Sequence, residues 1–456
     1  MTRTTIRVTR WAVVYTAWLV PALAAAQTSS PDQGPERPER PTGLPSSMNW
    51  TFNLDAAWGN FGYKNSRFND PKENVPENFG NYWFEGFVKP KVSAQHTLES
   101  TSQLYGTVSA VGERTYGSAP QLVGSDFSSF LPEDLSIGWR SGKSMGGTEN
   151  LVDVTVGRAP YQLGHGFLLY DGAAEGGSRG GYWSNARKAF AFAAIGRLKP
   201  THHTIESFYL KKDDLPEHVT GTELWGGNYE FRPDEHTTLG VTYMKFWAKP
   251  DVSPERDHLN VFNVRAYTAP IPSARDLSFE FEYAAERNAD ALHSNAWTLQ
   301  GAYQLRAVPW KPKITYRYAY FEGDDSSTPR NEGFDPLLLG FSDWGTWWQG
   351  EIGGEYFLVN SNLRSSLLRA HVSPTESIGA GAMYFNFALD KPASYAPGVT
   401  DSHLAFEVDL YTDWKINRNF TASFVVAFAN PGNAVAQAGG STRNFNYGMV
   451  YLAYGY

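Results

Sequence analysis

The chain has 456 residues, a formal net charge of −8 and no cysteine. The lack of cysteine excludes disulfide-stapled folds, thiolate zinc sites and cysteine nucleophiles. The acidic balance argues against a nucleic-acid partner, because non-specific binding to nucleic acid needs a basic surface. After Leu23 no apolar run approaches the roughly 18–20 residues that a transmembrane helix needs. A helical membrane protein is therefore excluded, whereas a membrane β-barrel is not.

The first 47 residues indicate export. A basic start at Arg3, Arg7 and Arg10 is followed by an apolar stretch and three alanines at 24–26, which predicts a signal peptide over residues 1–26. The alternative, an N-terminal core helix, fits this alanine-rich end less well. Residues 27–47 are rich in proline, which blocks helix and ladder hydrogen bonds, so we expect an extended periplasmic leader.

From Trp50 onward apolar and polar residues alternate, as in a strand with one apolar face. The pattern recurs at residues 277–284, 297–306, 314–320 and 404–413. A soluble sandwich would give the same alternation. We favour a membrane barrel because the predicted strands are about ten residues long. In addition, Glu280 and Glu282 lie on the same face of one predicted strand. Charged side chains on that face need water, which a pore lumen supplies and the core of a soluble sandwich does not.

Short predicted turns alternate with long polar connections, as in outer-membrane barrels with short periplasmic turns and long outer loops. Counting Thr346–Asn360 as part of one loop over 322–362 gives an even number of strands. The predicted fold is all-β, a transmembrane antiparallel up-and-down β-barrel of about 18 strands over residues 48–456. Long loops are expected at 159–184 and 322–362, the second folding over or into the pore. The final strand places Val450, Leu452, Tyr454 and Tyr456 on one face and resembles the recognition strand of outer-membrane barrels.

Several loop motifs resemble those of the alginate export family. They are Val156-Gly157-Arg158, residues 164–168, Gly176-Gly177-Ser178-Arg179-Gly180-Gly181-Tyr182-Trp183, residues 186–190, Phe334-Asp335-Pro336, residues 340–344, Gln349-Gly350-Glu351 and residues 361–363. The resemblance implies an 18-stranded barrel in the outer membrane of a Gram-negative cell. It also implies export of a polyanionic uronate polysaccharide through an arginine-containing lumen, with periplasmic export partners.

Seven arginines are candidate pore residues. Strand alternation places Arg265, Arg306, Arg317 and Arg369 on the lumen face, and the resemblance places Arg158, Arg179 and Arg187 in or beside the loop motif. A guanidinium fork suits a sugar carboxylate. Acidic residues are also predicted to face inward, so the lumen is expected to be mixed in charge.

Arg158 conflicts with its neighbours, since alternation with the valines before it points it toward lipid. A bulge at Gly157 would turn Arg158 inward. A snorkelling arginine at the membrane interface is the alternative.

Loop aromatics supply a second group of candidates. Tyr182, Trp183 and Trp344, beside Glu351, offer flat faces that can stack on sugar rings. The alternative is that they anchor the loops to the barrel rim.

Enzyme signatures are weak. The chain has no Gly-x-Ser-x-Gly motif, and His165 has no clear nucleophile beside it. The pairs Asp213-Asp214 and Asp324-Asp325 lack calcium-loop spacing and are expected to be solvated. We therefore expect no catalytic residues, no metal and no cofactor.

The sequence leaves three functions open. We expect a passive outer-membrane channel for an anionic polysaccharide or oligosaccharide. An uptake porin for sugar acids or oligosaccharides is the alternative, because a passive pore has no built-in direction. A loop-presenting adhesin or barrel enzyme is the third reading.

Overall fold

The computed structural model describes residues 48–66, 82–98, 100–120, 125–145, 148–289, 291–340 and 348–456. The expected signal peptide (1–26) and periplasmic leader (27–47) lie outside these residues. No helix in the described ranges is long and apolar enough to cross a membrane.

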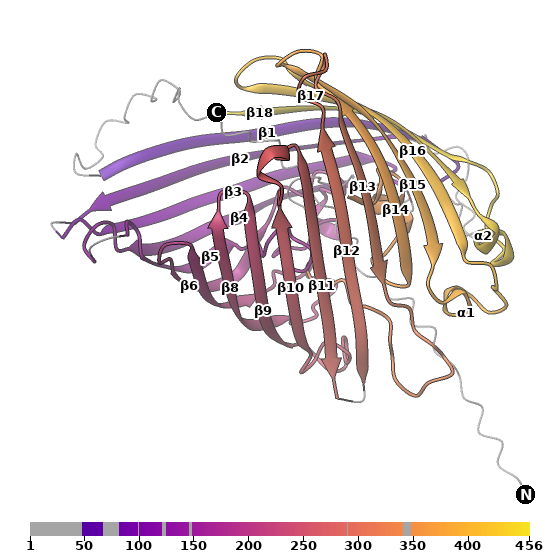
Figure 1. The fold of residues 1–456 in the computed structure, drawn as a ribbon, viewed down its shortest axis with the longest axis horizontal. Coiled ribbons are helices and arrows are strands. Elements are labelled where there is room, and N and C mark those ends of the chain that lie inside the picture. The colour runs from indigo at the N-terminus through magenta and orange to yellow at the C-terminus, as the bar shows by residue number, and fades with distance from the viewer. Residues whose placement is uncertain are drawn as a thin grey trace, which may run out of the picture.

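Eighteen antiparallel strands form one closed barrel (Figure 1). The strands are β1 (Met48–Lys64), β2 (Tyr82–Thr97), β3 (Gln103–Gly117), β4 (Ser125–Arg140), β5 (Val152–Pro160), β6 (Ala189–Leu198), β7 (His203–Lys211), β8 (Glu223–Asp234), β9 (Thr237–Trp247), β10 (Asn260–Thr268), β11 (Leu277–Asn288), β12 (Leu292–Gln304), β13 (Lys313–Phe321), β14 (Leu363–Val372), β15 (Ile378–Leu389), β16 (His403–Lys415), β17 (Phe420–Pro431) and β18 (Phe445–Gly455). Each strand pairs with its neighbours in sequence, and β1 pairs with β18 to close the barrel. This confirms the predicted up-and-down barrel and its even strand number.

Side chains alternate between the two faces of the wall. On β13, Tyr316 is 54% exposed on the outside, whereas the next residue, Arg317, is 1% exposed on the inside. On β11, Phe279 and Phe281 are exposed and Glu282 is buried. Because successive strand residues point to opposite faces, the outer surface is apolar and the charges lie within. The predicted alternation is confirmed on these strands.

Connection lengths differ between the two ends of the barrel. Tight turns such as 199–202, 235–236 and 416–419 lie at one end, whereas most connections at the other end are longer. β13 ends at Phe321 and β14 begins at Leu363, so residues 322–362 form a single connection and Thr346–Asn360 is not a strand. The other predicted loop, 159–184, is shifted, because β5 runs to Pro160 and β6 begins at Ala189.

Two connections fold into the barrel. We call residues 161–188 the first inward loop and 322–362 the second; most described residues of 161–188 and 348–358 are buried. They bond through their backbones, since Tyr170 N donates to Leu338 O at 2.8 Å and Leu338 N donates to Leu168 O at 3.1 Å. The bracing loop, 212–222, joins the first inward loop where Ala174 N donates to Asp213 O at 2.9 Å. Three loops thus form one connected body.

Candidate functional site

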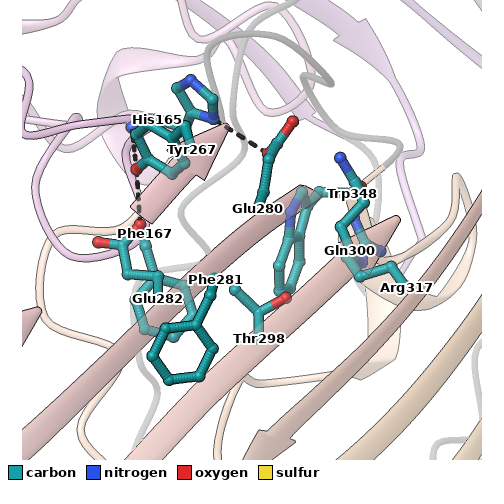
Figure 2. A pocket seen from close by; sticks show the side chains of 10 residues that line it. All are labelled: His165, Phe167, Tyr267, Glu280, Phe281, Glu282, Thr298, Gln300, Arg317 and Trp348. Atoms are coloured by element: carbon teal, nitrogen blue, oxygen red, sulfur yellow. Dashed lines mark hydrogen bonds and ion pairs between the residues drawn. The ribbon is translucent and has the colours of Figure 1, made fainter. Parts of the chain in front are cut away.

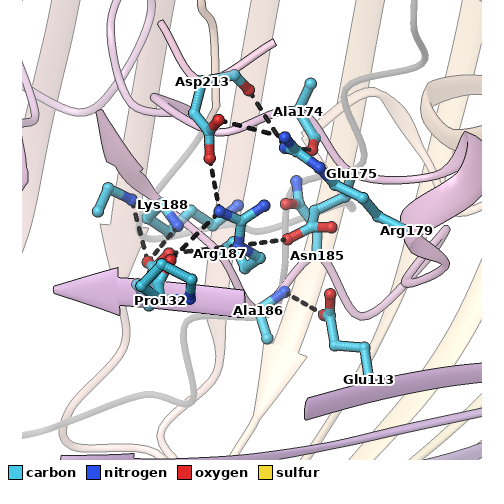
Figure 3. Close-up of polar contacts among 12 residues, drawn as sticks. Glu113, Pro132, Ala174, Glu175, Arg179, Asn185, Ala186, Arg187, Lys188 and Asp213 are labelled. Carbon is cyan, nitrogen blue, oxygen red and sulfur yellow. Dashed lines mark hydrogen bonds and ion pairs between the residues drawn. The ribbon is translucent and has the colours of Figure 1, made fainter. Parts of the chain in front are cut away.

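Three predicted arginines converge on one carboxylate of the bracing loop, and Figure 3 shows two of them, Arg179 and Arg187, beside Asp213. Asp213 Oδ2 accepts Arg158 Nη2 at 2.7 Å and Arg187 Nη2 at 2.5 Å, and its Oδ1 accepts Arg179 Nη2 at 3.2 Å. Burial would raise the pKa of Asp213, but the hydrogen bond from Arg158 and the charges of Arg187 and Arg179 hold this pKa below its ordinary value. Asp213 is therefore not the solvated loop charge that we expected.

A wall irregularity directs Arg158 inward. The β5–β6 register shifts between Gly157 and Ala159, and Gly157 has a φ of 125°. Arg158 also donates from Nε to Glu133 O at 3.1 Å. These contacts agree with the expected bulge and not with a snorkelling arginine, because both partners lie on the inner side of the wall.

Acids surround Arg187 on the side away from Asp213. Its Nε lies 3.7 Å from Glu133 Oε2 and 3.8 Å from Glu175 Oε1. Burial, and then the neighbouring Glu113, raise the pKa of Glu175 well above its ordinary value. Arg179 and Arg187 form ion pairs with these acids and with Asp213, so they hold the loops together.

Carboxylates of the barrel wall hold the inward loops by their backbones. Glu85 on β2 accepts the N–H groups of Trp183 and Ser184 at 2.8 and 2.9 Å. Glu407 on β16 accepts those of Ile352 and Gly353, both at 2.7 Å. Each carboxylate satisfies two loop donors that would otherwise be buried without partners. The acidic lumen residues are thus anchors of the loop body.

Trp183 and Glu351 connect the two inward loops. Trp183 Nε1 donates to Glu351 Oε1 at 2.8 Å, and the Trp183 ring packs on Phe61 and Tyr451. Both residues are buried, so they differ from the expected sugar-stacking surface and fit the anchoring alternative. Half-buried Tyr182 packs beside Phe127. Trp344 lies outside the described residues.

A narrow cavity of about 20 Å³, room for about one water molecule, lies between the inner wall and the inward loops (Figure 2). It is lined by His165, Phe167, Tyr267, Glu280, Phe281, Glu282, Thr298, Gln300, Arg317 and Trp348. The Arg317 guanidinium lies 3.9 Å from the centre of the Trp348 ring. The His165 ring stacks on Tyr267 at 3.9 Å, and His165 Nδ1 lies 3.2 Å from Glu280 Oε2. The cavity therefore combines a cation, aromatic faces, an amide and carboxylates.

The remaining predicted arginines have different surroundings. Arg265 is buried on the inner wall and bonds Glu230 at 2.8 Å. Arg369 donates from Nε and Nη2 to Tyr411 Oη at 2.8 and 2.6 Å. Arg306 does not face the lumen, because β12 ends at Gln304; it is exposed in the turn and forms an ion pair with Asp276. Strand alternation no longer applies beyond the end of a strand.

Sequence reasoning missed two important positions. Trp348 lies in the same loop as the candidate Trp344, but nothing in the sequence pairs it with Arg317, and only the folded loop brings the two together. Asp213 looked like a loop charge, and no local pattern indicated its three arginine partners. The acidic residues of the site were easier to predict, because strand alternation places Glu280 and Glu282 on one inward face, and Glu282 is buried there.

Comparison with known proteins agrees with this architecture. OccAB2 of Acinetobacter baumannii matches with 12% identity and a TM-score of 0.57 over 90% of this chain and 98% of that one. OccK1 (OpdK) of Pseudomonas aeruginosa matches with 11% identity and a TM-score of 0.56 over 89% and 98%. OpdK crystallised with vanillate gives 10% identity and a TM-score of 0.55 over the same shares. At these identities the likeness is one of fold.

No curated protein sequence matches this chain. The family model for alginate export matches residues 229–448, which run from β8 to β18 and include the second inward loop. The family and the fold are both of the channel type and place the barrel in the outer membrane. The match over residues 229–448 supports assignment of this chain to the alginate export family.

Proposed function

We propose that this outer-membrane channel passes an anionic polysaccharide or oligosaccharide by passive diffusion, with Arg317 as its principal anion-selective residue. The supporting observation is the position of Arg317 against Trp348 in the wall of the interior cavity. A guanidinium pairs with a sugar carboxylate, and an aromatic face packs on the apolar face of a sugar ring. Arg158, Arg179, Arg187 and Arg265 support the site indirectly, because acids and amides already engage their donors.

Uptake of sugar acids or short oligosaccharides is a second candidate function. It is favoured by the inward loops, because they fill much of the barrel interior, and a small solute passes a narrowed channel more easily than a polymer does. The likeness to OpdK, crystallised with the carboxylate vanillate, is consistent with a small anionic cargo.

Planar-bilayer measurements test the proposal. Under a salt gradient, Arg317→Gln should lower the anion-to-cation permeability ratio, because Glu280 and Glu282 then dominate the cavity charge. Arg317→Lys should keep most of the anion preference. Arg306→Gln is the matched control, since this arginine is exposed in a turn. An unchanged reversal potential in Arg317→Gln would contradict the proposed role.

The same bilayers separate the two candidate functions. The current is measured with polyuronate and with a uronate disaccharide, at equal concentrations of uronate residues. Stronger block by the polymer would support polymer passage. Block that is strongest with the mono- and disaccharide uronates would support uptake. If neutral sugars block as strongly as uronates do, neither anionic cargo is correct.

A further inference from the structure

A hollow lies on the outer face of the barrel, where the first and last strands meet. Gly62 on β1 pairs with Gly448 on β18, so two neighbouring outward positions carry no side chain. Tyr82 of β2 lies on one side of this glycine pair and Val426 of β17 lies on the other. A Cβ added to Gly448 would come no nearer than 3.8 Å to another heavy atom, which leaves the space above it open.

The next row of outward residues completes the hollow. Asn60 pairs with Val450, and Phe84 and Phe424 flank them. The space bounded by these strands is about 470 Å³, open to the surroundings and almost wholly apolar, within the range of about 300–1,000 Å³ typical of small-molecule sites. We call it the outer-face hollow. Figure 1 shows β2, β1 and β18 side by side along this part of the wall.

Asn60 is the polar exception in the hollow. Its outward amide has no hydrogen-bond partner within the described ranges of the chain, although the surrounding side chains are apolar. An amide that faces hydrocarbon without a partner costs free energy, so a ligand that carries a hydrogen-bonding group is favoured there.

Basic side chains border the end of the hollow nearest the long loops. Lys64 is the last residue of β1, faces outward like Asn60 and is exposed. Exposed Arg443 precedes β18, and Asn65 Nδ2 donates to Asn444 O at 2.9 Å, which holds this segment beside the end of β1. With short turns in the periplasm and long loops outside, this end lies in the outer leaflet.

We propose that the outer-face hollow binds an acylated, phosphorylated glycolipid of the outer leaflet, the chemistry of lipid A. The upper part of one acyl chain lies over the glycine pair, the Asn60 amide, one row deeper in the membrane, bonds a hydroxyl or ester oxygen carried by this chain, and Lys64 and Arg443 pair with the phosphate. Lipid tails are as apolar as the wall itself, so the acyl chain supplies fit, and the polar contacts supply most of the selectivity. The charge complementarity favours this occupant over a second copy of the chain, whose hollow carries the same two cations.

Native mass spectrometry of the full-length mature protein with added lipid A tests the proposal. The wild type should retain lipid A in preference to phosphatidylethanolamine. Gly448→Leu fills the hollow and should abolish this preference. Lys64→Glu should lower retention by about fivefold or more, the factor that corresponds to about 1 kcal/mol per basic residue at an anionic surface.

Two outward-facing residues elsewhere on the barrel provide matched controls. Gly227→Leu fills an equally open position on β8, and Lys211→Glu reverses a charge at the loop end of β7. Both should retain lipid A as the wild type does. Equal retention by Gly448→Leu and wild type would overturn the proposal, as would equal loss in the control variants. If the wild type forms a dimer, and Gly448→Leu abolishes this dimer without changing lipid A retention, the hollow binds a second copy of the chain instead.

Discussion

The charged residues inside this barrel serve mainly to hold its loops. Asp213 is the clearest case, because one carboxylate accepts hydrogen bonds from Arg158, Arg179 and Arg187. A buried charge that loses its partner is costly, so these four residues depend on one another. Arg317 differs, because its guanidinium lies on an aromatic ring in the wall of a cavity.

Asp213→Asn should loosen the first inward loop without unfolding the barrel. The three arginines lose their shared negative charge, and hydrogen bonds to charged groups contribute about 1.5–3 kcal/mol each. Hydrogen–deuterium exchange of residues 161–188 should become faster, while exchange of the β11–β13 strands stays unchanged. Equal exchange of this loop in both proteins would refute the role of Asp213.

The same variant gives a pH dependence with a definite sign. The pKa of Asp213 is lower in the folded protein than its ordinary value, so its stabilising contribution is present above about pH 4 and lost as the pH falls through the folded pKa. The difference in loop exchange between wild type and Asp213→Asn should therefore be constant near neutral pH and disappear in acid. A difference that grows on acidification would show the opposite linkage.

At the scale of single elements, the bulge at Gly157 determines where Arg158 points. A Cβ at Gly157 would lie 2.2 Å from Leu135 O, and a φ of 125° is unfavourable for any other residue. Gly157→Ala should therefore destabilise the protein by about 1–3 kcal/mol, measured by urea unfolding in detergent. Gly196→Ala on the neighbouring strand is the control, because its nearest atom is 4.0 Å away. Equal effects of the two substitutions would contradict the strained bulge.

The second inward loop should depend on its anchor on β16. Glu407→Ala leaves the N–H groups of Ile352 and Gly353 without their acceptor, so the loop should leave its buried position more often. Single-channel recordings should then show a larger or more fluctuating conductance. Glu376→Ala, at an exposed turn, should conduct as the wild type does. A conductance of Glu407→Ala that equals the wild-type value would remove Glu407 as an anchor.

At the scale of the whole molecule, most of the fold could be predicted from the alternation of apolar and polar residues along the strands. The periodicity of two that places Tyr316 outside and Arg317 inside is a local property of the sequence. The strand count also followed, because an even number required 322–362 to be one loop. The loop interior could not be predicted in this way, because the contacts of Asp213 and of Trp348 join segments far apart in sequence and have no periodic pattern.

The orientation of the wall residues is the central claim, and spin labelling measures it directly. The chain has no cysteine, so Tyr316→Cys and Thr315→Cys each provide one labelling site, on the outer and inner faces of β13. In lipid vesicles, the label at 316 should be relaxed far more strongly by membrane-soluble oxygen than by a water-soluble nickel complex, and the label at 315 should lack this preference for oxygen. Relaxation of the label at 316 by nickel as strong as at a loop position such as Val252 would contradict a lipid-facing wall, and with it the membrane channel.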